Sequence, residues 1–283
     1  MRKILLYALT VYKKLPGQSV TSAAIKTYSI LIAMVLLYLP CLCHAGKSIT
    51  IATLEWEPYI GTRLENQGFM AQITRIAFKS QGYDVQYVFL PWKRAVVMAE
   101  AGIYDGYFPA YWARRRLKKS IFTDAIIAGT IGFFKKKSDT IVFTDLKDLK
   151  PYRIGVVRGY INTVEFDAAD YLTKEEAVSD LQNLQKLAGN RVDLIVCDRF
   201  VEQYLVKHYL PDLASRIEFM KPALQVKNLY ICISKKAENA QKKVAVFNKG
   251  LQQIKKQGIF NKIAHRYGFG EPVSHPWSHK ESR

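Results

Sequence analysis

The sequence predicts an α/β protein with largely parallel sheets, and two patterns along the chain carry that prediction. Short runs rich in β-branched residues, such as 48–54 (SITIATL) and 84–90 (DVQYVFL), alternate as strands do. Runs with apolar residues at helical spacing follow them, and glycine closes several of these runs. Strands that alternate with helices indicate a layered α/β architecture. With 283 residues, 49% of them apolar, the chain can form one large domain or two modest ones.

The first 45 residues differ in kind from the rest of the chain. They contain five basic residues and no acid, and an apolar run from 30 to 43 leads to Cys43-His44-Ala45-Gly46. A basic lead, a short apolar run and a small residue predict a secretory signal peptide cleaved after Ala45. The apolar run is shorter than the ~20 residues that span a bilayer, although an uncleaved membrane anchor remains the alternative.

Export and charge together narrow the classes of partner. The formal charge of +18 falls to +13 once the five basic residues of the leader are removed. This excess favours acidic partners or an anionic envelope surface. An exported chain without a recognised binding motif argues against a nucleic-acid partner.

The elements of the N-terminal half follow in a regular order. After strand 48–54, the turn EWEPYIG places Trp56 and Tyr59 on either side of Pro58, where α/β proteins usually present ligand groups. Trp56 either covers a ligand there or only packs the loop. A helix is predicted over 68–80, a strand over 84–90 and a helix over 91–101. Trp92 opens that last helix, and Arg94, two residues on, faces either a cleft or solvent.

The stretch from 104 to 124 interleaves rings with positive charges. Tyr107, Phe108, Tyr111 and Trp112 precede five basic residues within RRRLKK, and Ile-Phe-Thr-Asp follows. Arginine holds a carboxylate through two parallel N–H bonds, and ring walls that exclude water strengthen that contact. The stretch is therefore either one wall of a binding cleft or a solvated basic helix followed by a core strand.

The C-terminal half continues the alternation of strands and helices. An extended run at 128–134 is followed by a short helix at 145–149 and a buried strand at 152–157, after which Tyr160 stands beside Gly159. A helix around 181–187, a strand at 191–197, a helix at 200–208 and a return strand at 229–234 come next. Two helices with apolar stripes at 244–254 and 259–267 close the chain, and residues 268–283 are expected to be frayed.

Two cysteines remain after cleavage, Cys197 and Cys232. An even pair in an oxidising compartment suggests one disulfide, but each cysteine sits in an apolar, strand-like run, so two buried thiols are the alternative. No His/Cys cluster has metal-ligand spacing, and we expect neither a metal nor a cofactor. Asp198, at the end of strand 191–197, either faces a cleft or caps the next helix.

These elements, in this order, resemble the bacterial family 3 extracellular solute-binding proteins, the periplasmic receptors of polar amino-acid ABC transporters. The resemblance covers 49–269. It rests on Pro58-Tyr59, Gly68-Phe69, AGIYDG at 101–106, an arginine followed by IFTD, YRIGVVRG, NRVDLIVCD and KQGIFNKIAHRYGF. It implies a periplasmic-binding-protein-like fold, with two α/β lobes joined by two crossing strands near 129–135 and 229–234.

The resemblance also implies how the chain is divided. The first lobe would comprise 46–130 and 233–270, the second lobe 131–232, and a polar tail 271–283. The ligand would lie in the cleft between the lobes, and hinge closure over it would be what a membrane transporter recognises.

The family pattern assigns roles to three residues. Arg116, at the position before Ile-Phe-Thr-Asp, would clamp a ligand carboxylate, Asp198 would take the ammonium group, and Trp56 would cover the ligand. A zwitterion needs such opposite charges at the two ends of a desolvated pocket. The site departs from the family pattern, because small hydroxyl residues are replaced by aromatic ones. We expect five further residues to line the site: Phe108, Tyr111, Trp92, Arg94 and Tyr160. Trp92 and Arg94 would suit an aromatic or additionally acidic ligand.

The expected function is therefore that of a monomeric periplasmic receptor that binds an amino acid or related solute and passes it to an ABC transporter permease. Two alternatives remain. The first is a sensory protein that works with a separate membrane partner. The second is a dehydratase similar to cyclohexadienyl dehydratase, which would need a general acid in the cleft. Glu55 and Glu57 are the nearby candidates, and both are expected to be solvated loop charges.

Overall fold

The computed structural model describes residues 47–269. The predicted signal peptide at 1–45 and polar tail at 271–283 therefore lie outside the described residues. Within 47–269, no helix combines the length and the apolar character needed to cross a membrane.

Three parallel strands build the first lobe. β1 (Lys47–Thr53) pairs along its length with β2 (Tyr83–Phe89) and near its end with β3 (Gly106–Tyr111). The connections are α3 (Phe69–Lys79) and α4 (Trp92–Glu100), and each packs its apolar stripe against the sheet. These bounds confirm the first four elements predicted from the sequence.

The second lobe repeats this parallel arrangement. β6 (Arg153–Val157) lies between β7 (Thr173–Ala177) and β8 (Leu194–Asp198). The helices of this lobe are α5 (Val164–Ala168), α6 (Asp180–Ala188) and α7 (Arg199–Tyr209). The sequence did not predict α5 or β7, because α5 is short and β7 (TKEEA) is a polar strand at the sheet edge.

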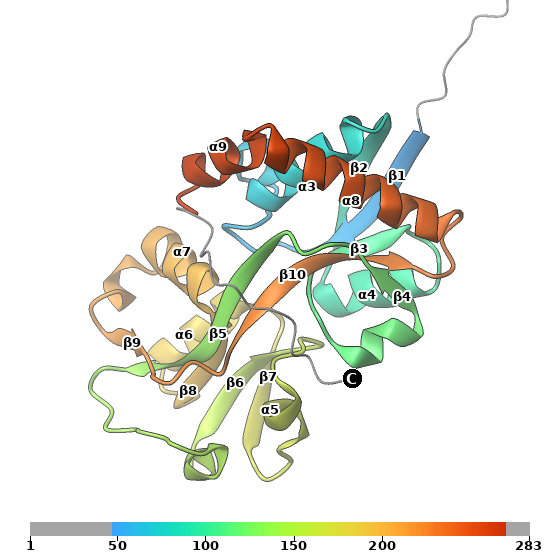
Figure 1. Ribbon diagram of the computed structural model, residues 1–283. Helices are drawn as coiled ribbons and strands as arrows, with labels where there is room; N and C mark the ends of the chain where they lie inside the picture. The colour runs from blue at the N-terminus through green and yellow to red at the C-terminus, as the bar shows by residue number, and fades with distance from the viewer. Residues whose placement is uncertain (1–46, 270–283) are drawn as a thin grey trace, which may run out of the picture. The chain divides into compact units, whose positions relative to one another are not determined.

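Two long strands run through both lobes. β5 (Ile127–Lys136) and β10 (Gln225–Ser234) are antiparallel neighbours, and the strand order is β2-β1-β3-β10-β5-β8-β6-β7. β4 (Ser120–Phe122) pairs with β10, and β9 (Ile217–Phe219) pairs with β5. Figure 1 shows both crossing strands between the two groups of helices. The two-lobe fold is confirmed, with a sheet that is parallel within each lobe and antiparallel at the junction.

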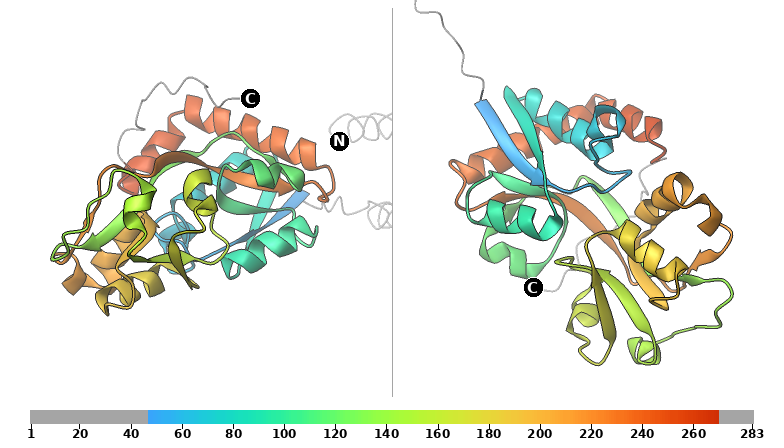
Figure 2. Two further views of the ribbon diagram at one scale, coloured as in Figure 1. Left: turned by 90° about the horizontal axis from the view of Figure 1, so that it is seen from below. Right: turned by 180° about the vertical axis from the view of Figure 1, so that it is seen from behind.

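After the second crossing, the chain returns to the first lobe. α8 (Ala240–Lys256) lies against α3, and α9 (Ile259–Arg266) follows it (Figures 1 and 2). The approach of α8 to α3 requires Gly250, because a Cβ there would stand 2.0 Å from the carbonyl oxygen of Ala77. The Phe247 and Phe78 rings pack beside this contact at 5.1 Å.

Four segments form 3₁₀ helices: η1 (Glu65–Gln67), η2 (Arg114–Lys118), η3 (Leu146–Leu149) and η4 (Pro211–Leu213). The predicted short helix at 145–149 is η3, capped by Asp145. The predicted fraying from residue 268 is wrong at Phe269, which is buried and stacks on Tyr59.

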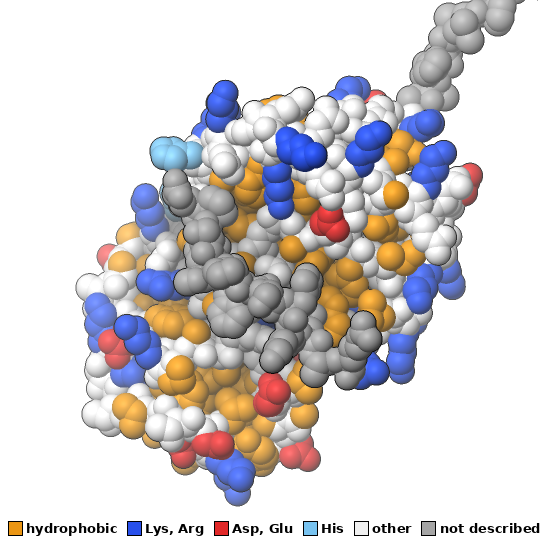
Figure 3. Space-filling model, in the orientation of Figure 1, with side chains coloured by type: hydrophobic (Ala, Val, Ile, Leu, Met, Phe, Trp, Pro, Cys, Tyr) orange, Lys and Arg blue, Asp and Glu red, His pale blue; other side chains and the backbone are white. Residues whose placement is uncertain are grey.

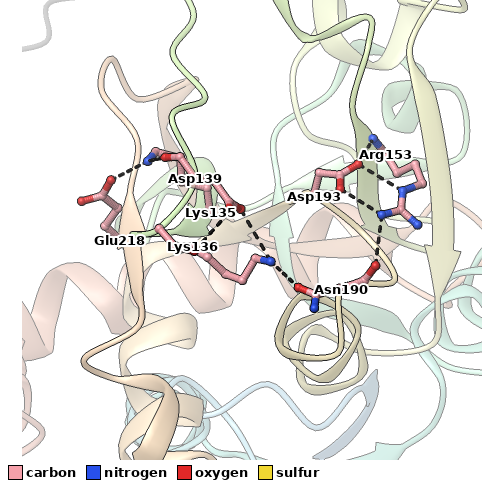
Figure 4. A network of polar contacts seen from close by, with 8 residues as sticks. Lys135, Lys136, Asp139, Arg153, Asn190, Asp193 and Glu218 are labelled. Carbon is pink, nitrogen blue, oxygen red and sulfur yellow. Dashed lines mark hydrogen bonds and ion pairs between the residues drawn. The ribbon is translucent and has the colours of Figure 1, made fainter.

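A polar network ties together the far end of the second lobe (Figure 4). Lys135 on β5 pairs with Glu218 on β9 at 2.7 Å, and the Arg153 guanidinium on β6 pairs with Asp193 at 2.9 Å. Lys136 and Arg153 both bond to Asn190, at its side chain and its carbonyl respectively. Elsewhere, Lys and Arg side chains spread over the visible face without gathering in one patch (Figure 3), as expected of solvated surface charge.

The possible disulfide between Cys197 and Cys232 is not formed, and both thiols are buried and free. Cys197 pairs with Gly132 of β5, whereas Gln225 of β10 pairs with the adjacent Ile131. Cys232 lies seven residues beyond Gln225, which is about 23 Å along a strand. A disulfide needs Cα atoms within about 7 Å, so strand register excludes the bond.

Candidate functional site

A hollow lies between the two lobes. Its walls come from the ends of β1, β3 and β8, from the start of α4, from the loop after β6, from η2 and from β5. The lining residues are Leu54, Trp56, Trp92, Pro109, Tyr111, Arg116, Ile131, Tyr160, Ile161, Asn162, Val196, Cys197 and Asp198. Most of these side chains are apolar or aromatic and a few are polar, the usual composition of a small-molecule site.

Arg116 is the cation of this hollow. It belongs to the basic stretch for which the sequence left a cleft wall and a solvated helix as alternatives. Only 5% of Arg116 is accessible, while Arg114 and Arg115 beside it are exposed. The turn of η2 brings the guanidinium over the rings of Trp92 and Tyr107, 5.4 Å from each centroid. Its Nε and Nη1 atoms are buried without a hydrogen-bond partner in the described part of the chain. Buried donors left unpaired are costly, so this group calls for an anion.

Asp198 is an anion of the same hollow and is 3% exposed. It caps α7 by accepting bonds from the backbone amides of Phe200 and Val201 at 2.9 and 3.2 Å. Tyr111 donates to it at 2.6 Å, and Tyr59 at 3.2 Å. Burial raises its pKa to about 6, although these four donors favour the charged form. Both roles weighed from the sequence are therefore present, because one carboxylate caps the helix and also lines the hollow.

Asp180, which the sequence reasoning missed, is a second buried carboxylate behind the walls of the hollow. It is 4% exposed. It accepts bonds from Trp56 Nε1 at 3.1 Å, Tyr160 Oη at 3.0 Å and Cys197 Sγ at 3.3 Å. Burial raises its pKa. All three donors line the hollow, so Asp180 fixes the orientation of its walls.

The aromatic walls meet nearly at right angles. The Trp56 ring stands edge-on to Tyr111 and Tyr160, with centroids 5.9 and 6.4 Å away, and Trp92 stands edge-on to Tyr160 at 6.4 Å. Tyr59 stacks on Trp56 at 4.7 Å from behind. Such edge-to-face packing is favourable and leaves little freedom to the rings. The hollow is thus a rigid aromatic box with Arg116 beside it.

Two of the expected ligand-binding residues lie elsewhere. Phe108 is fully buried and stacks on Tyr87 in the core at 5.3 Å. Arg94 is exposed, because α4 turns Trp92, Ala95 and Ala99 inward and leaves Arg94 on the opposite side. The structure brings the other six together: Arg116, Asp198, Trp56, Tyr111, Trp92 and Tyr160 all line the hollow.

The two glutamates considered as general acids lie outside the hollow. Glu55 is exposed and accepts bonds from Thr62, as expected of a loop charge. Glu57 differs from that expectation, since it is only 7% exposed and accepts a bond of 2.7 Å from Tyr209 of α7. Both line a second hollow, which shares Trp56 with the first. Neither glutamate is among the residues that line the hollow of Arg116.

Lys227 of β10 adds positive charge near this site. Its ammonium donates to the carbonyl of Asn162 at 2.6 Å and stands 5.4 Å from the centroid of the Tyr111 ring. Burial lowers its pKa to about 8. Arg116, in contrast, keeps unpaired donors.

Among residues 47–269, no cluster of His, Cys, Asp and Glu could hold a metal ion.

A family model described as bacterial extracellular solute-binding proteins, family 3, matches residues 49–271. Among curated proteins, none matches this sequence.

Solved structures share the fold at low sequence identity. A histidine kinase sensor domain with similarity to periplasmic binding proteins has a TM-score of 0.70 at 16% identity, covering 78% of this chain and 96% of its own. A substrate-binding protein of an ABC uptake transporter from Streptococcus pneumoniae, with bound histidine, reaches 0.68 at 20%, covering 80% and 94%. An ancestral amino acid-binding protein, a precursor of cyclohexadienyl dehydratase, reaches 0.62 at 19%, covering 78% and 94%.

Proposed function

This chain belongs to the bacterial extracellular solute-binding proteins of family 3, and from that premise we propose that it captures an amino acid or a close relative by closing its lobes. It then delivers the solute to an ABC transporter permease, and it works as a monomer without chemistry. Arg116 takes the carboxylate of the ligand, and Asp198 shares its oxygens with the ammonium group.

The unpaired Nε and Nη1 atoms of the Arg116 guanidinium are the observation that carries this proposal. Its two orphaned donors lie buried beside an aromatic wall, where a ligand carboxylate would complete them. Charge-assisted bonds of this kind are among the strongest in proteins, and burial strengthens them further. Asp198 and Asp180 place negative charge on the second lobe, and their hydrogen-bond donors are neutral groups. A ligand with both charges fits this polarity.

A thermal-shift screen of the purified protein tests the proposal, with amino acids, polyamines, organic acids and prephenate as probes. A ligand at a hundred times its Kd adds roughly 2.7 kcal/mol of stability, a shift on the order of 5–10 °C for a chain of this size. We expect Arg116→Ala to abolish the shift and Arg116→Lys to retain part of it. Arg114→Ala, in the same 3₁₀ helix but exposed, serves as the matched control.

The outcomes separate the candidate ligand classes. An amino-acid hit that Arg116→Ala and Asp198→Ala both abolish supports the proposal. A hit among organic acids that only Arg116→Ala abolishes keeps the receptor but removes the amino-acid ligand. If the ligand raises the Tm of Arg116→Ala as much as that of wild type, the ligand does not bind at Arg116 and the proposed site is wrong.

The proposal includes export, because the leader predicted at residues 1–45 and the family both favour the periplasm. N-terminal sequencing of the protein from a periplasmic fraction is expected to begin at Gly46. Recovery only from membranes, with the first residues intact, would contradict cleavage after Ala45.

Sensing is the second candidate function, favoured by the fold shared with a histidine kinase sensor domain. The ligand site would be the same, and only the membrane partner would differ. Capture of the ligand-loaded protein by a permease, rather than by a membrane kinase, supports transport. Catalysis is less well supported, because Glu55 and Glu57 do not line the hollow. Turnover of prephenate that is lost in Glu57→Gln would revive it.

A further inference from the structure

We infer that the ligand carries a single carboxylate and an uncharged, apolar or aromatic side chain. This inference rests on the proposed function and narrows its substrate class. The first line of support is the number of positively charged side chains that line the hollow. Arg116 is the one arginine or lysine among its lining residues, and a ligand α-carboxylate would occupy its free donors. Arg94, which would have suited a second acidic group, lies on the exposed side of α4.

The two buried carboxylates near the hollow already accept hydrogen bonds from the protein itself. Asp198 accepts bonds from two phenols and two backbone amides, and Asp180 accepts from an indole, a phenol and a thiol. A carboxylate has about four acceptor positions. Four donors already occupy these positions of Asp198, so a ligand ammonium group would have to replace or share the place of one of the two phenols, and no position is left for a second cation. Asp180 stands behind Trp56, Tyr160 and Cys197, so a cationic ligand side chain would meet rings before it met this acid.

The remaining surface of the hollow is apolar. Four aliphatic side chains line it (Leu54, Ile131, Ile161 and Val196), together with the rings of Trp56, Trp92, Tyr111 and Tyr160. Asn162 is the neutral amide among the lining residues, and its Nδ2 already donates to Asp167. A charged or amide-bearing side chain would lose its hydration there without gaining matched partners, whereas an apolar side chain would gain by burial.

Asp180 acts here as a positioning residue. Its bonds to Trp56 and Tyr160 join a wall from the first lobe to a wall from the second, and so set the shape of the apolar part of the hollow. Tyr160 offers the cleanest probe of this wall. Tyr160→Phe keeps the ring and removes the bond to Asp180, while Tyr160→Ala removes both.

The test is calorimetric titration of the wild-type protein with ligands of matched shape. L-leucine, L-asparagine and L-aspartate have closely similar branched skeletons and differ in polarity and charge. L-norleucine and L-lysine form a second pair, and L-phenylalanine probes the rings. We expect L-leucine or L-phenylalanine to bind at least tenfold more tightly than L-asparagine, L-aspartate and L-lysine. With that ligand, Tyr160→Phe should stay within about threefold of wild type, and Tyr160→Ala should lose at least tenfold.

Each outcome decides the inference. If L-aspartate, L-asparagine or L-lysine binds more tightly than L-leucine and L-phenylalanine, the inference of an apolar ligand side chain is wrong, while the proposed receptor function stands. Failure of these and all other small solutes to bind overturns both. An equal loss in Tyr160→Phe and Tyr160→Ala shows that the polar bond, and not the ring, governs binding, and contradicts the role given to the apolar wall.

Discussion

The ionised carboxylate of Asp198 is less favourable in the folded protein than in the unfolded chain, because it is buried. Burial raises its pKa to about 6, whereas an aspartate in an unfolded chain titrates near 3.9. The folded protein therefore binds this proton more tightly than the unfolded chain does. The stability that Asp198 contributes is fully present below pH 4, and it is lost as the pH rises through about 6. Under the proposed function, the ammonium group of the ligand would offset this cost of the buried charge.

The first residue-scale prediction follows from this titration. Asp198→Asn keeps a side chain that can cap α7 and removes the buried charge. Without ligand at pH 7.5, it should be more stable than wild type by up to about 3 kcal/mol, and near pH 4 the two should converge. Urea unfolding across pH 4–7.5 measures the difference. Glu202, whose pKa burial raises to about 7, titrates in both proteins and cancels in the comparison. A variant less stable than wild type at pH 7.5 would contradict the prediction.

The same variant predicts the pH dependence of binding. An ammonium group needs the ionised carboxylate, so wild-type affinity for an amino acid should rise as the pH increases through about 6 and then level off. Asp198→Asn should bind weakly and without this rise. If the affinity of the wild-type protein did not change with pH, Asp198 would not be the group that binds the ammonium.

Gly129 carries the second residue-scale prediction. It lies on β5 beside the site, and a Cβ there would stand 2.3 Å from Asp198 Oδ2 and 2.6 Å from Tyr111 Oη. Gly129→Ala should therefore displace Asp198 and weaken ligand binding at least tenfold. Gly132→Ala is the matched control on the same strand, because its methyl group meets the Phe219 ring, away from the site. Both variants should lose stability, but only Gly129→Ala should lose affinity beyond that. Equal affinities would contradict the prediction.

At the scale of elements, the segment after α9 does more than end the fold. Phe269 lies against Tyr59 and Phe69 of the first lobe and against Phe200 of α7, with ring centroids between 4.7 and 5.3 Å apart. One ring therefore joins the segment after α9 to both lobes. The predicted fraying is wrong at this residue, whereas residues 270–283 lie outside the described part of the chain.

We predict that Phe269→Ala destabilises the protein by about 3 kcal/mol, the usual cost of emptying a phenylalanine site. For a chain of this size, this corresponds to a fall in Tm of roughly 6–12 °C. Differential scanning calorimetry measures it, and Tyr171→Ala, at a tyrosine that is 39% exposed, provides the control. A change below 1 °C would show that Phe269 does not contribute to the core.

The elements also show where sequence patterns succeed. Strands and helices with a clear apolar period, such as β1, α3 and α8, were predicted close to their bounds. β7 lacks that period because it is an edge strand of polar residues, and η2 was ambiguous because its charged residues mask the one arginine that turns inward. Periodicity reports a continuous buried face, and neither segment has one.

At the scale of the whole molecule, the loop after β1 connects the lobes. Trp56 bonds to Asp180, Tyr59 bonds to Asp198, and Glu57 accepts a bond from Tyr209 of α7. The first two contacts belong to the walls of the hollow, and the third lies outside it. Under the proposed function, this one loop would couple lobe closure to ligand binding, as a hinge mechanism requires.

The Tyr209–Glu57 bond allows closure to be tested without altering the site. Tyr209→Phe leaves a buried carboxylate without this donor in the closed form, which costs about 1.5–3 kcal/mol. Ligand affinity should fall by roughly 10- to 150-fold, and small-angle X-ray scattering should show a smaller ligand-induced decrease in the radius of gyration than in wild type. Tyr171→Phe is the control. Unchanged affinity and unchanged compaction together would exclude the bond from closure.

Local apolar patterns in the sequence predicted most of the alternating strands and helices, because each of these elements buries a continuous face. The resemblance to the family added the two crossing strands and pointed to Arg116 and Asp198, both of which line the hollow. Tertiary structure decided which neighbours face the hollow. β3 is buried on both faces, so its pattern could not tell that Phe108 packs into the core while Tyr111 lines the site. Asp180 became visible only when folding placed it beside Trp56, 124 residues away in the chain. Local periodicity fixes an element, whereas a site between lobes depends on contacts between distant segments, which no single stretch of sequence records.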